Sequence, residues 1–344
     1  MILKWFRIAR WLSLPQSMLP AFTALALALA AGKENFSWIL GITGITGVWF
    51  LHLGMNLFDD YFDYKYKGVD YRERMAAKGI KARIAKCTYL IQEGGTETLR
   101  KTFWVAVFFV AIAFICGAII FYFRGIDFTN GITVTNAGWS IICIALTVGF
   151  LGVEYSAPPL KLSYHGLADI VIGFIFGPLL MLGIYVSACG DFSWQILFFS
   201  VPVGLLVSNI LFTDSMLEFN ADRSVGKKNL AVVIGKQKKN LVISAFCNFA
   251  PPVIVTLGII YADFSSWYIL VWLSCYLAVA LFYYMIWFVK DPNRKFERKM
   301  WMGPFQKWDN IVKYGIDWYM LRWYIARNYV VLFCFIVIVI SLIR

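Results

Sequence analysis

An asparagine and three aspartates near residue 60 have the side chains and the spacing to bind a metal ion. They lie in the segment NLFDDYFD, residues 56–63, which we term the first acidic motif; its polar members are Asn56, Asp59, Asp60 and Asp63. On a helix, at about 100° per residue, these four side chains fall within about 100° of one another. The motif therefore presents carboxylate and amide oxygens on one helical face.

A second acidic cluster has a regular spacing of four residues. It consists of Asp214, Glu218 and Asp222, and we term residues 214–222 the second acidic motif. On a helix these three residues also share one face. A single acidic group at a helix end is often only a solvated terminus. Two such groups, each following a long apolar segment, favour a shared functional site.

Cations are required if these carboxylates are to lie together inside a membrane cavity, because like charges repel and would otherwise stay partly protonated. Mg²⁺ takes oxygen ligands and commonly joins one or two carboxylates to substrate phosphates. The chain has only two histidines, and its seven cysteines are scattered without a C-x-x-C pair, which argues against zinc, iron or copper. The motifs therefore predict Mg²⁺ as the cofactor and a diphosphate as its partner.

The elements that carry these motifs must lie in a lipid bilayer. Of the 344 residues, 60% are hydrophobic and 15% are charged, and the mean hydropathy is +0.68. An average soluble domain is about 45–50% apolar and about 25% charged. This composition excludes a cytosolic enzyme, a disordered chain and a disulfide-stapled secreted module.

Nine long apolar stretches predict an all-α, polytopic membrane protein with nine transmembrane helices. The stretches cover roughly residues 16–32, 38–58, 102–123, 137–156, 169–189, 194–214, 241–262, 267–289 and 329–343. Pro251 and Pro252 predict a kink or break in the seventh. No segment indicates a separate soluble domain, so residues 1–344 are expected to form one integral-membrane domain. Its expected cytoplasmic loops are residues 64–101, 215–240 and 290–328.

The basic residues predict the orientation in the membrane. With the N-terminus in the cytoplasm, 29 of the 32 Lys and Arg residues lie on the cytoplasmic side, and only Lys33, Arg124 and Arg344 lie outside. The positive-inside rule then places the N-terminus and the motif-bearing loops in the cytoplasm and the C-terminus outside, in the cell or inner membrane. The net charge of +12 is explained by this asymmetry and by anionic lipid, so it does not indicate nucleic acid.

The N-terminal segment combines aromatic and basic residues in a way that is typical of an interfacial helix. Residues 2–14 are expected to form an amphipathic helix that lies at the membrane surface. The small residues of the ALALALAAG run, 24–32, resemble a signal-peptide cleavage region. Eight further apolar stretches follow, which favours a retained first span over cleavage.

Both acidic motifs resemble those of the UbiA superfamily of intramembrane prenyltransferases. The first acidic motif, followed by the KGVD of residues 67–70, is similar to the first aspartate-rich motif of that family. The second acidic motif, followed by GKKNLAVVIG, is similar to the second. The family usually has Asn and Asp where this chain has Asp214 and Glu218.

The segment between the motifs adds to this resemblance. YSAPPLKLSYHGLAD at residues 155–169, followed by FGP at 176–178, is similar to the branch of the family that prenylates 1,4-dihydroxy-2-naphthoate in menaquinone synthesis. The likeness extends over roughly residues 8–240. It implies helices around a central cavity that is open to the cytoplasmic side and to lipid.

The resemblance implies roles for particular residues in the departure of a Mg²⁺-bound diphosphate from an allylic carbon. The expected metal ligands are Asn56, Asp59, Asp60, Asp63, Asp214, Glu218 and Asp222. Of these, the expected catalytic residues are Asp60, Asp63, Asp214 and Asp222. The expected diphosphate-binding residues are Arg10, Tyr155, Lys161 and Lys227. For Lys227 and its neighbour Lys228, an ordinary role as positively charged loop residues is equally consistent with the sequence.

The predicted function is Mg²⁺-dependent transfer of a polyprenyl group from polyprenyl diphosphate to an aromatic acceptor, with 1,4-dihydroxy-2-naphthoate as the leading candidate. The alternative acceptors are another quinone precursor, a tetrapyrrole alcohol and a glycerophosphate lipid. A cation-coupled transporter is the non-enzymatic alternative, and it predicts inverted repeats with acidic residues near the bilayer midplane. No repeat is evident in the sequence, and both motifs lie toward the ends of apolar stretches. Prenyl length, the number of metals and the oligomeric state stay open.

Overall fold

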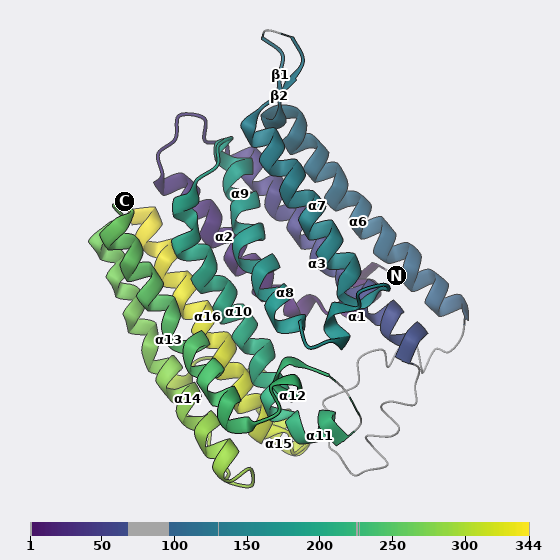
Figure 1. Cartoon of the computed structure of the whole chain (residues 1–344), viewed down its shortest axis with the longest axis vertical. Helices are drawn as coiled ribbons and strands as arrows, with labels where there is room; N and C mark the ends of the chain where they lie inside the picture. Colours follow the sequence, from purple (N-terminus) through teal and green to yellow (C-terminus); the bar gives the residue numbers. More distant parts are fainter. Residues whose placement is uncertain (1, 68–95, 130, 225, 227, 344) are drawn as a thin grey trace. The chain divides into compact units, whose positions relative to one another are not determined.

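The computed structural model describes residues 2–67, 96–129, 131–224, 226 and 228–343, and nearly all of these are helical (Figure 1). The chain divides into two compact units. Unit 1 comprises Met1–Leu162 and Leu179–Ile196, and unit 2 comprises Ser163–Pro178 and Leu197–Arg344. The first acidic motif belongs to unit 1 and the second to unit 2, so each is described within its own unit.

Unit 1 holds the N-terminal helices and a short hairpin. Its elements are α1 (Ile2–Ile8), the 3-10 turn η1 (Trp11–Ser13), α2 (Pro15–Ala30), α3 (Trp38–Lys67), α6 (Thr96–Gly125), β1 (Ile126–Asp127), β2 (Thr133–Val134), α7 (Asn136–Ser156) and α9 (Leu180–Cys189). The strands β1 and β2 pair antiparallel between α6 and α7. Helices α3 and α6 pack along each other, and α9 lies against α2 and α3.

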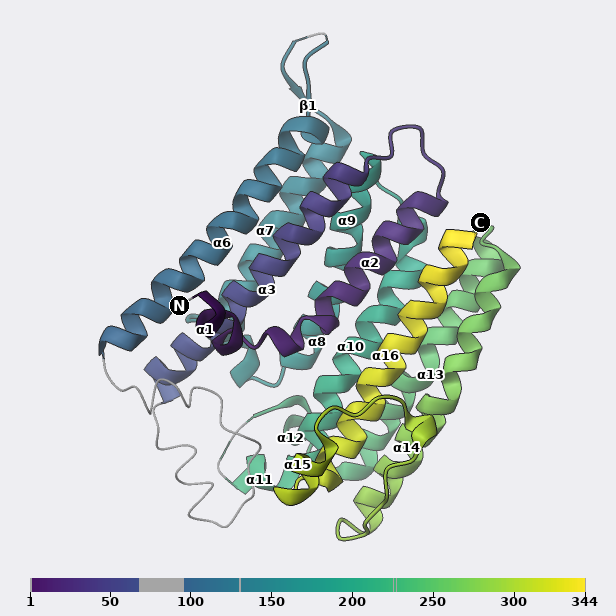
Figure 2. The ribbon, with the colours of Figure 1, turned by 180° about the vertical axis from the view of Figure 1, so that it is seen from behind.

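Unit 2 holds the C-terminal helices. Its elements are α8 (Ala168–Phe174), α10 (Leu197–Leu217), α11 (Phe219–Ser224), α12 (Leu230–Ile234), α13 (Gln237–Tyr261), the 3-10 helix η5 (Ser266–Ser274), α14 (Cys275–Lys290), the 3-10 turn η6 (Met300–Met302), α15 (Trp308–Lys313) and α16 (Asp317–Ile343). Helices α10, α13, α14 and α16 pack side by side, as the views from the two sides show (Figures 1 and 2). A π-helical turn, Ile175–Leu179, follows α8.

Eight helical runs among the described residues are long and apolar enough to cross a membrane. A helix is suited to lipid because it satisfies its own backbone N–H and C=O groups. The remaining predicted span corresponds to α2, an apolar helix of 16 residues. The prediction of an all-α, multi-pass membrane protein is confirmed, and its count of nine spans is approximate.

The last span begins earlier than the sequence suggested. The expected stretch was residues 329–343, whereas α16 already begins at Asp317. The difference arises because two arginines on the early turns of α16 are accommodated inside unit 2. Arg322 is 1% exposed and donates from Nε to the main-chain oxygen of Tyr284 at 3.1 Å. Arg327 donates from Nη2 to the main-chain oxygen of Pro304 at 2.9 Å.

Of the kink or break expected at Pro251 and Pro252, the break is absent, because α13 is continuous from Gln237 to Tyr261. A proline has no N–H, so Pro252 leaves the carbonyl of Asn248 without its helical donor. The Tyr329 hydroxyl donates to this carbonyl at 2.9 Å. A neighbouring helix therefore supplies the missing hydrogen bond, which is how prolines are tolerated in membrane helices.

The N-terminal segment is also divided differently from the expected helix at residues 2–14. Helix α1 ends at Ile8, Arg10 adopts the left-handed conformation with φ 60° and ψ 45°, and η1 follows. Ala9 and Leu14 are buried in a core with Leu53, Leu57, Ala106 and Phe109 from α3 and α6. This packing fixes the segment on α3, next to the first acidic motif.

The expected loops contain more helix than the sequence indicated. Residues 215–240 include α11 and α12, and residues 290–328 include η6, α15 and the early turns of α16. In the expected loop at residues 64–101, α3 continues to Lys67 and α6 begins at Thr96. Residues 68–95 between them, including the motif residues Gly68 to Asp70, lie outside the described residues.

Candidate active site

The first acidic motif occupies the last turns of α3, where helical spacing places its polar residues on one face as predicted. The Asp59 side chain is 13% exposed and that of Asp60 is 3% exposed. Asp63 lies one turn further along and is half-buried. Buried carboxylates need compensating charge or hydrogen bonds, and the N-terminal segment supplies both.

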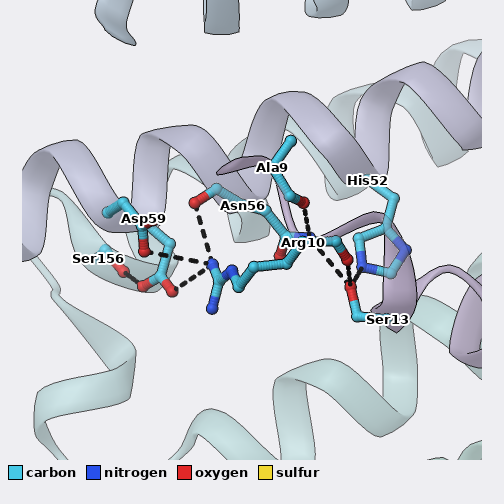
Figure 3. Close-up of polar contacts among 8 residues, drawn as sticks. Ala9, Arg10, Ser13, His52, Asn56, Asp59 and Ser156 are labelled. Atoms are coloured by element: carbon cyan, nitrogen blue, oxygen red, sulfur yellow. Dashed lines mark hydrogen bonds and ion pairs between the residues drawn. The ribbon is translucent and has the colours of Figure 1, made fainter. Parts of the chain in front are cut away.

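Arg10 is the cation beside these carboxylates (Figure 3). Its Nη2 donates to Asp59 Oδ2 at 3.2 Å and to the main-chain oxygen of Asn56 at 3.0 Å. The same nitrogen lies 3.5 Å from Asp60 Oδ1. A guanidinium shared by two adjacent carboxylates offsets their mutual repulsion. The structure therefore joins a residue expected to bind diphosphate to two expected metal ligands.

Two further contacts orient the motif. Ser156, the last residue of α7, donates from Oγ to Asp59 Oδ1 at 2.8 Å. The side-chain amide of Asn56 donates to Ala9 O at 3.0 Å and to Ser13 Oγ at 3.2 Å. The amide hydrogens of Asn56 are thus directed to the N-terminal segment, and its oxygen is the atom that can ligate a metal.

Tyr155 and Lys161, both expected to bind diphosphate, flank a tight turn after α7. Tyr155 is half-buried in the last turn of the helix. Lys161 has a positive φ of 46°. The buried Glu154 holds this turn, because its Oε2 accepts the N–H of Leu160 at 2.7 Å. Glu154 therefore fixes the backbone from which Lys161 projects.

The second acidic motif spans the end of α10 and the short helix α11. Helix α10 ends at Leu217, so the three acidic residues do not lie on one uninterrupted helix as expected. The spacing is nevertheless kept through the junction, since Glu218 N–H donates to Asp214 O at 3.0 Å and Asp222 N–H donates to Glu218 O at 2.8 Å. Asp214 and Glu218 are half-buried.

Asp222 is fixed by the GKKN segment that follows it. Its side chain is buried, and Oδ2 accepts a hydrogen bond from Asn229 Nδ2 at 2.6 Å. The oxygen of the same Asn229 side chain accepts the N–H of Val232 at 2.9 Å and so caps α12. Lys228 is exposed, and Lys227 lies outside the described residues.

Sequence reasoning did not identify four residues of unit 1 that hold the first acidic motif, the Arg10 turn or the turn after α7: Ser13, His52, Glu154 and Ser156. A signal existed for Glu154, because an acidic residue inside an apolar stretch is expensive and usually functional. No comparable signal marked the serines or His52, which are ordinary polar residues until the fold brings them together.

The oxygen donors of both motifs fit a hard divalent cation. The described residues contain no group of three or more His, Cys, Asp or Glu side chains that could hold a metal ion. Mg²⁺ commonly takes only one or two protein carboxylates and completes its octahedron with water and phosphate oxygens. Carboxylate, amide and hydroxyl oxygens such as those near Asp59 therefore suit it better than zinc, iron or copper.

Fold and site together define a multi-pass α-helical membrane protein in which an arginine and two carboxylates meet near the end of a spanning helix. The sequence profile of the UbiA prenyltransferase family matches residues 17–309, and the chain belongs to this family. It is a prenyltransferase, as the resemblance of its motifs predicted.

Three curated relatives carry naphthoate or naphthoquinone names. The 2-carboxy-1,4-naphthoquinone phytyltransferase of Synechocystis sp. is 33% identical over 31% of this chain and 34% of that protein. The 1,4-dihydroxy-2-naphthoate octaprenyltransferase of Haemophilus influenzae is 26% identical over 72% of this chain and 76% of the relative. The enzyme of the same name from Bacillus subtilis is 22% identical over 78% of each chain. The first match thus spans about a third of the relative, and the others about three quarters.

Solved structures show the same fold at low sequence identity. A digeranylgeranylglyceryl phosphate synthase matches with a TM-score of 0.60 and 12% identity, covering 100% of this chain and 99% of the other. The UbiA homologue of Aeropyrum pernix K1 gives 0.58 at 15% identity, covering 95% and 96%. The UbiA homologue of Archaeoglobus fulgidus bound to GPP and Mg²⁺ gives 0.51 at 14% identity, covering 98% and 99%.

Proposed function

We propose that the protein catalyses the Mg²⁺-dependent transfer of a polyprenyl group from polyprenyl diphosphate to 1,4-dihydroxy-2-naphthoate in menaquinone synthesis. The observation that carries the proposal is the placement of Arg10 Nη2 within 3.5 Å of two adjacent carboxylates. This contact places a cation that can bind phosphate oxygens beside carboxylates that can bind Mg²⁺. The naphthoate acceptor is supported by the names of the relatives from Haemophilus influenzae and Bacillus subtilis.

The residues that would hold Mg²⁺ are those of the two acidic motifs: Asn56, Asp59, Asp60, Asp63, Asp214, Glu218 and Asp222. When bound, the metal supplies Lewis-acid neutralisation of the charge that develops on the leaving diphosphate. We further propose that both motifs serve one diphosphate, with Asp60, Asp63, Asp214 and Asp222 as its principal anchors.

The cationic and hydroxyl groups of the chain bind the diphosphate itself. Arg10 is held at the carboxylates and offsets negative charge on the departing oxygens, where fixed donors act strongly because water is partly excluded. Lys161 and Tyr155 flank the same turn after α7 and provide a further cation and a phenol. Lys227 is proposed to contribute from the segment after the second acidic motif.

The membrane and the orientation are part of the same proposal. We place the protein in the cell or inner membrane with the N-terminus and the motif-bearing loops in the cytoplasm and the C-terminus outside. The asymmetry of 29 against 3 basic residues supports this orientation. Cysteine labelling of the N-terminal segment and the C-terminus in intact cells tests it.

The proposal is tested with membranes that contain the protein, geranylgeranyl diphosphate, Mg²⁺ and each acceptor in turn. We expect prenylated 1,4-dihydroxy-2-naphthoate, and the loss of Mg²⁺-dependent diphosphate release in both Asp60→Ala and Asp222→Ala. Product with a different acceptor alone would overturn the naphthoate assignment and leave prenyl transfer intact. Undiminished diphosphate release in both variants would overturn the site.

A further inference from the structure

His52 is a buried histidine of α3 that lies outside both acidic motifs. It is 8% exposed and precedes Asn56 by one helical turn. Its two ring nitrogens face two serine hydroxyls of the N-terminal segment: Nε2 lies 3.2 Å from Ser13 Oγ, and Nδ1 lies 2.6 Å from Ser17 Oγ. One imidazole therefore connects α3 to both the end of η1 and the first turn of α2.

The hydrogen bonds of Ser13 determine which ring nitrogen carries the proton. Its single hydroxyl hydrogen is donated to the main-chain oxygen of Arg10 at 2.8 Å. Ser13 Oγ must then accept from its other two neighbours, Asn56 Nδ2 at 3.2 Å and His52 Nε2 at 3.2 Å. The ring therefore donates from Nε2 to Ser13 Oγ. Its Nδ1 contacts Ser17 Oγ, which also lies 3.1 Å from the main-chain oxygen of Leu14.

This network holds the turn that contains Arg10 (Figure 3). Arg10 has φ 60° and ψ 45°, a left-handed conformation that costs a residue other than glycine about 1–3 kcal/mol unless its surroundings impose it. The turn is held at two consecutive carbonyls, because Asn56 Nδ2 donates to Ala9 O at 3.0 Å and Ser13 Oγ donates to Arg10 O at 2.8 Å. His52 in turn fixes Ser13.

We propose that His52 is a positioning residue for the diphosphate-binding Arg10. Through Ser13 it locks the left-handed turn, and that turn keeps the guanidinium beside Asp59 and Asp60. This inference rests on the proposed function, in which Arg10 binds the diphosphate. An aliphatic or aromatic residue at position 52 could fill the space, but it could not fix the hydroxyl of Ser13.

The test compares steady-state kinetics of Arg10→Gln, His52→Phe, His52→Gln and the double variant Arg10→Gln/His52→Phe. We expect His52→Phe to raise KM for the prenyl diphosphate about tenfold, a loss of about 1.4 kcal/mol in binding, without changing KM for the acceptor. His52→Gln keeps a donor and an acceptor and should recover most of this loss. In the Arg10→Gln background, His52→Phe should have no further effect on that KM, because the group that it positions is gone.

Ser13→Ala removes the single hydroxyl that links His52 to the turn at Arg10. It provides a second test of the proposal if His52→Phe does not fold. It should reproduce the rise in KM, whereas Ser140→Ala, which deletes a hydroxyl that donates to Asn136 O within α7, should not. Independent, multiplying effects of His52→Phe and Arg10→Gln would overturn the positioning role while leaving the proposed function intact. No effect of Arg10→Gln on KM for the diphosphate would instead contradict the binding role given to Arg10.

Discussion

Arg10 in unit 1 and Arg322 in unit 2 are held by different kinds of partner. The Arg10 side chain is 32% exposed, and its Nη2 contacts the carboxylates of Asp59 and Asp60. Arg322 is 1% exposed. It donates to the main-chain oxygens of Tyr284 and Trp318, and its guanidinium carbon lies 5.2 Å from the centre of the Phe288 ring.

The difference separates the cation that we propose to bind diphosphate from a structural cation. Arg10 is partly open to its surroundings and is paired with anions, so a diphosphate can join or replace its partners. Arg322 is sealed among carbonyl dipoles and aromatic rings, which spread its charge and join α14 to α16. In this chain, the accessible arginine that can exchange partners is the candidate for ligand binding, and the sealed one is structural.

Substitution of each arginine by glutamine tests whether Arg10 binds substrate and Arg322 stabilises the fold. We expect Arg10→Gln to lower kcat/KM for prenyl diphosphate about 100-fold, which is the size of effect typical of one electrostatic donor. The unfolding temperature in detergent should fall less than in Arg322→Gln, because the Arg10 side chain is 32% exposed and Asp59 keeps its hydrogen bond from Ser156. Circular dichroism on the same preparation checks this, and a large fall in stability without loss of transfer would reverse the assignment.

Arg322→Gln should lower the stability of the protein and leave its catalytic activity nearly unchanged. It removes two charge-assisted hydrogen bonds to main-chain oxygens, so we expect a loss of roughly 2–3 kcal/mol in the free energy of unfolding. Turnover per folded molecule should stay within about twofold of the wild type, a difference of about 0.4 kcal/mol. An unchanged free energy of unfolding would mean that the contacts with carbonyls and rings only offset the desolvation penalty of the buried cation.

The membrane fold could be predicted because its signals are local. A span is encoded by consecutive apolar residues, and the shared face of Asp59 and Asp60 follows from helical periodicity. The start of α16 is an exception. Its early turns carry Arg322 and Arg327, and in the sequence such charges are typical of a loop. Only the structure shows the carbonyls that accept their hydrogen bonds.

The site could be predicted only in part, because its supporting contacts are distant in the sequence. Ser156 is 97 residues from Asp59, and Ser13 is 39 residues from His52. A serine or a lone histidine in an apolar chain has several ordinary roles, so its type alone does not identify a partner. The resemblance indicated Arg10 as a binding residue, but the left-handed turn that places it could not be inferred from local pattern.

A neutral donor to a site carboxylate should matter less than the arginine. Ser156→Ala removes the hydroxyl that donates to Asp59 Oδ1, and we expect kcat/KM to fall about fivefold, close to the 1 kcal/mol of an ordinary hydrogen bond. Thr147→Ala is the matched control, since that hydroxyl donates to Cys143 O in the same helix. Equal losses in the two variants would show that Asp59 does not depend on Ser156 for its orientation.

Substitution of Asp127, in the hairpin between α6 and α7, is expected to have the smallest effect on prenyl transfer. It tests whether hydrogen bonds from neutral groups stabilise a carboxylate charge. Its Oδ1 accepts the N–H of Thr129 at 2.8 Å and the hydroxyl of Thr129 at 2.7 Å. These hydrogen bonds, the main-chain one above all, lower the pKa of this exposed carboxyl below its usual value. A carboxyl with a depressed folded-state pKa stabilises the hairpin above the unfolded pKa of about 3.9, and the contribution is lost as the pH falls through the folded value.

The amide chemical shift of Thr129, followed by NMR, should therefore titrate with a midpoint below about 3.9. In Asp127→Asn this titration should be lost, while prenyl transfer at neutral pH is unchanged. A midpoint at or above the unperturbed value would show that hydrogen bonds from neutral groups, without a cation such as Arg10, do not hold the charge of this carboxylate.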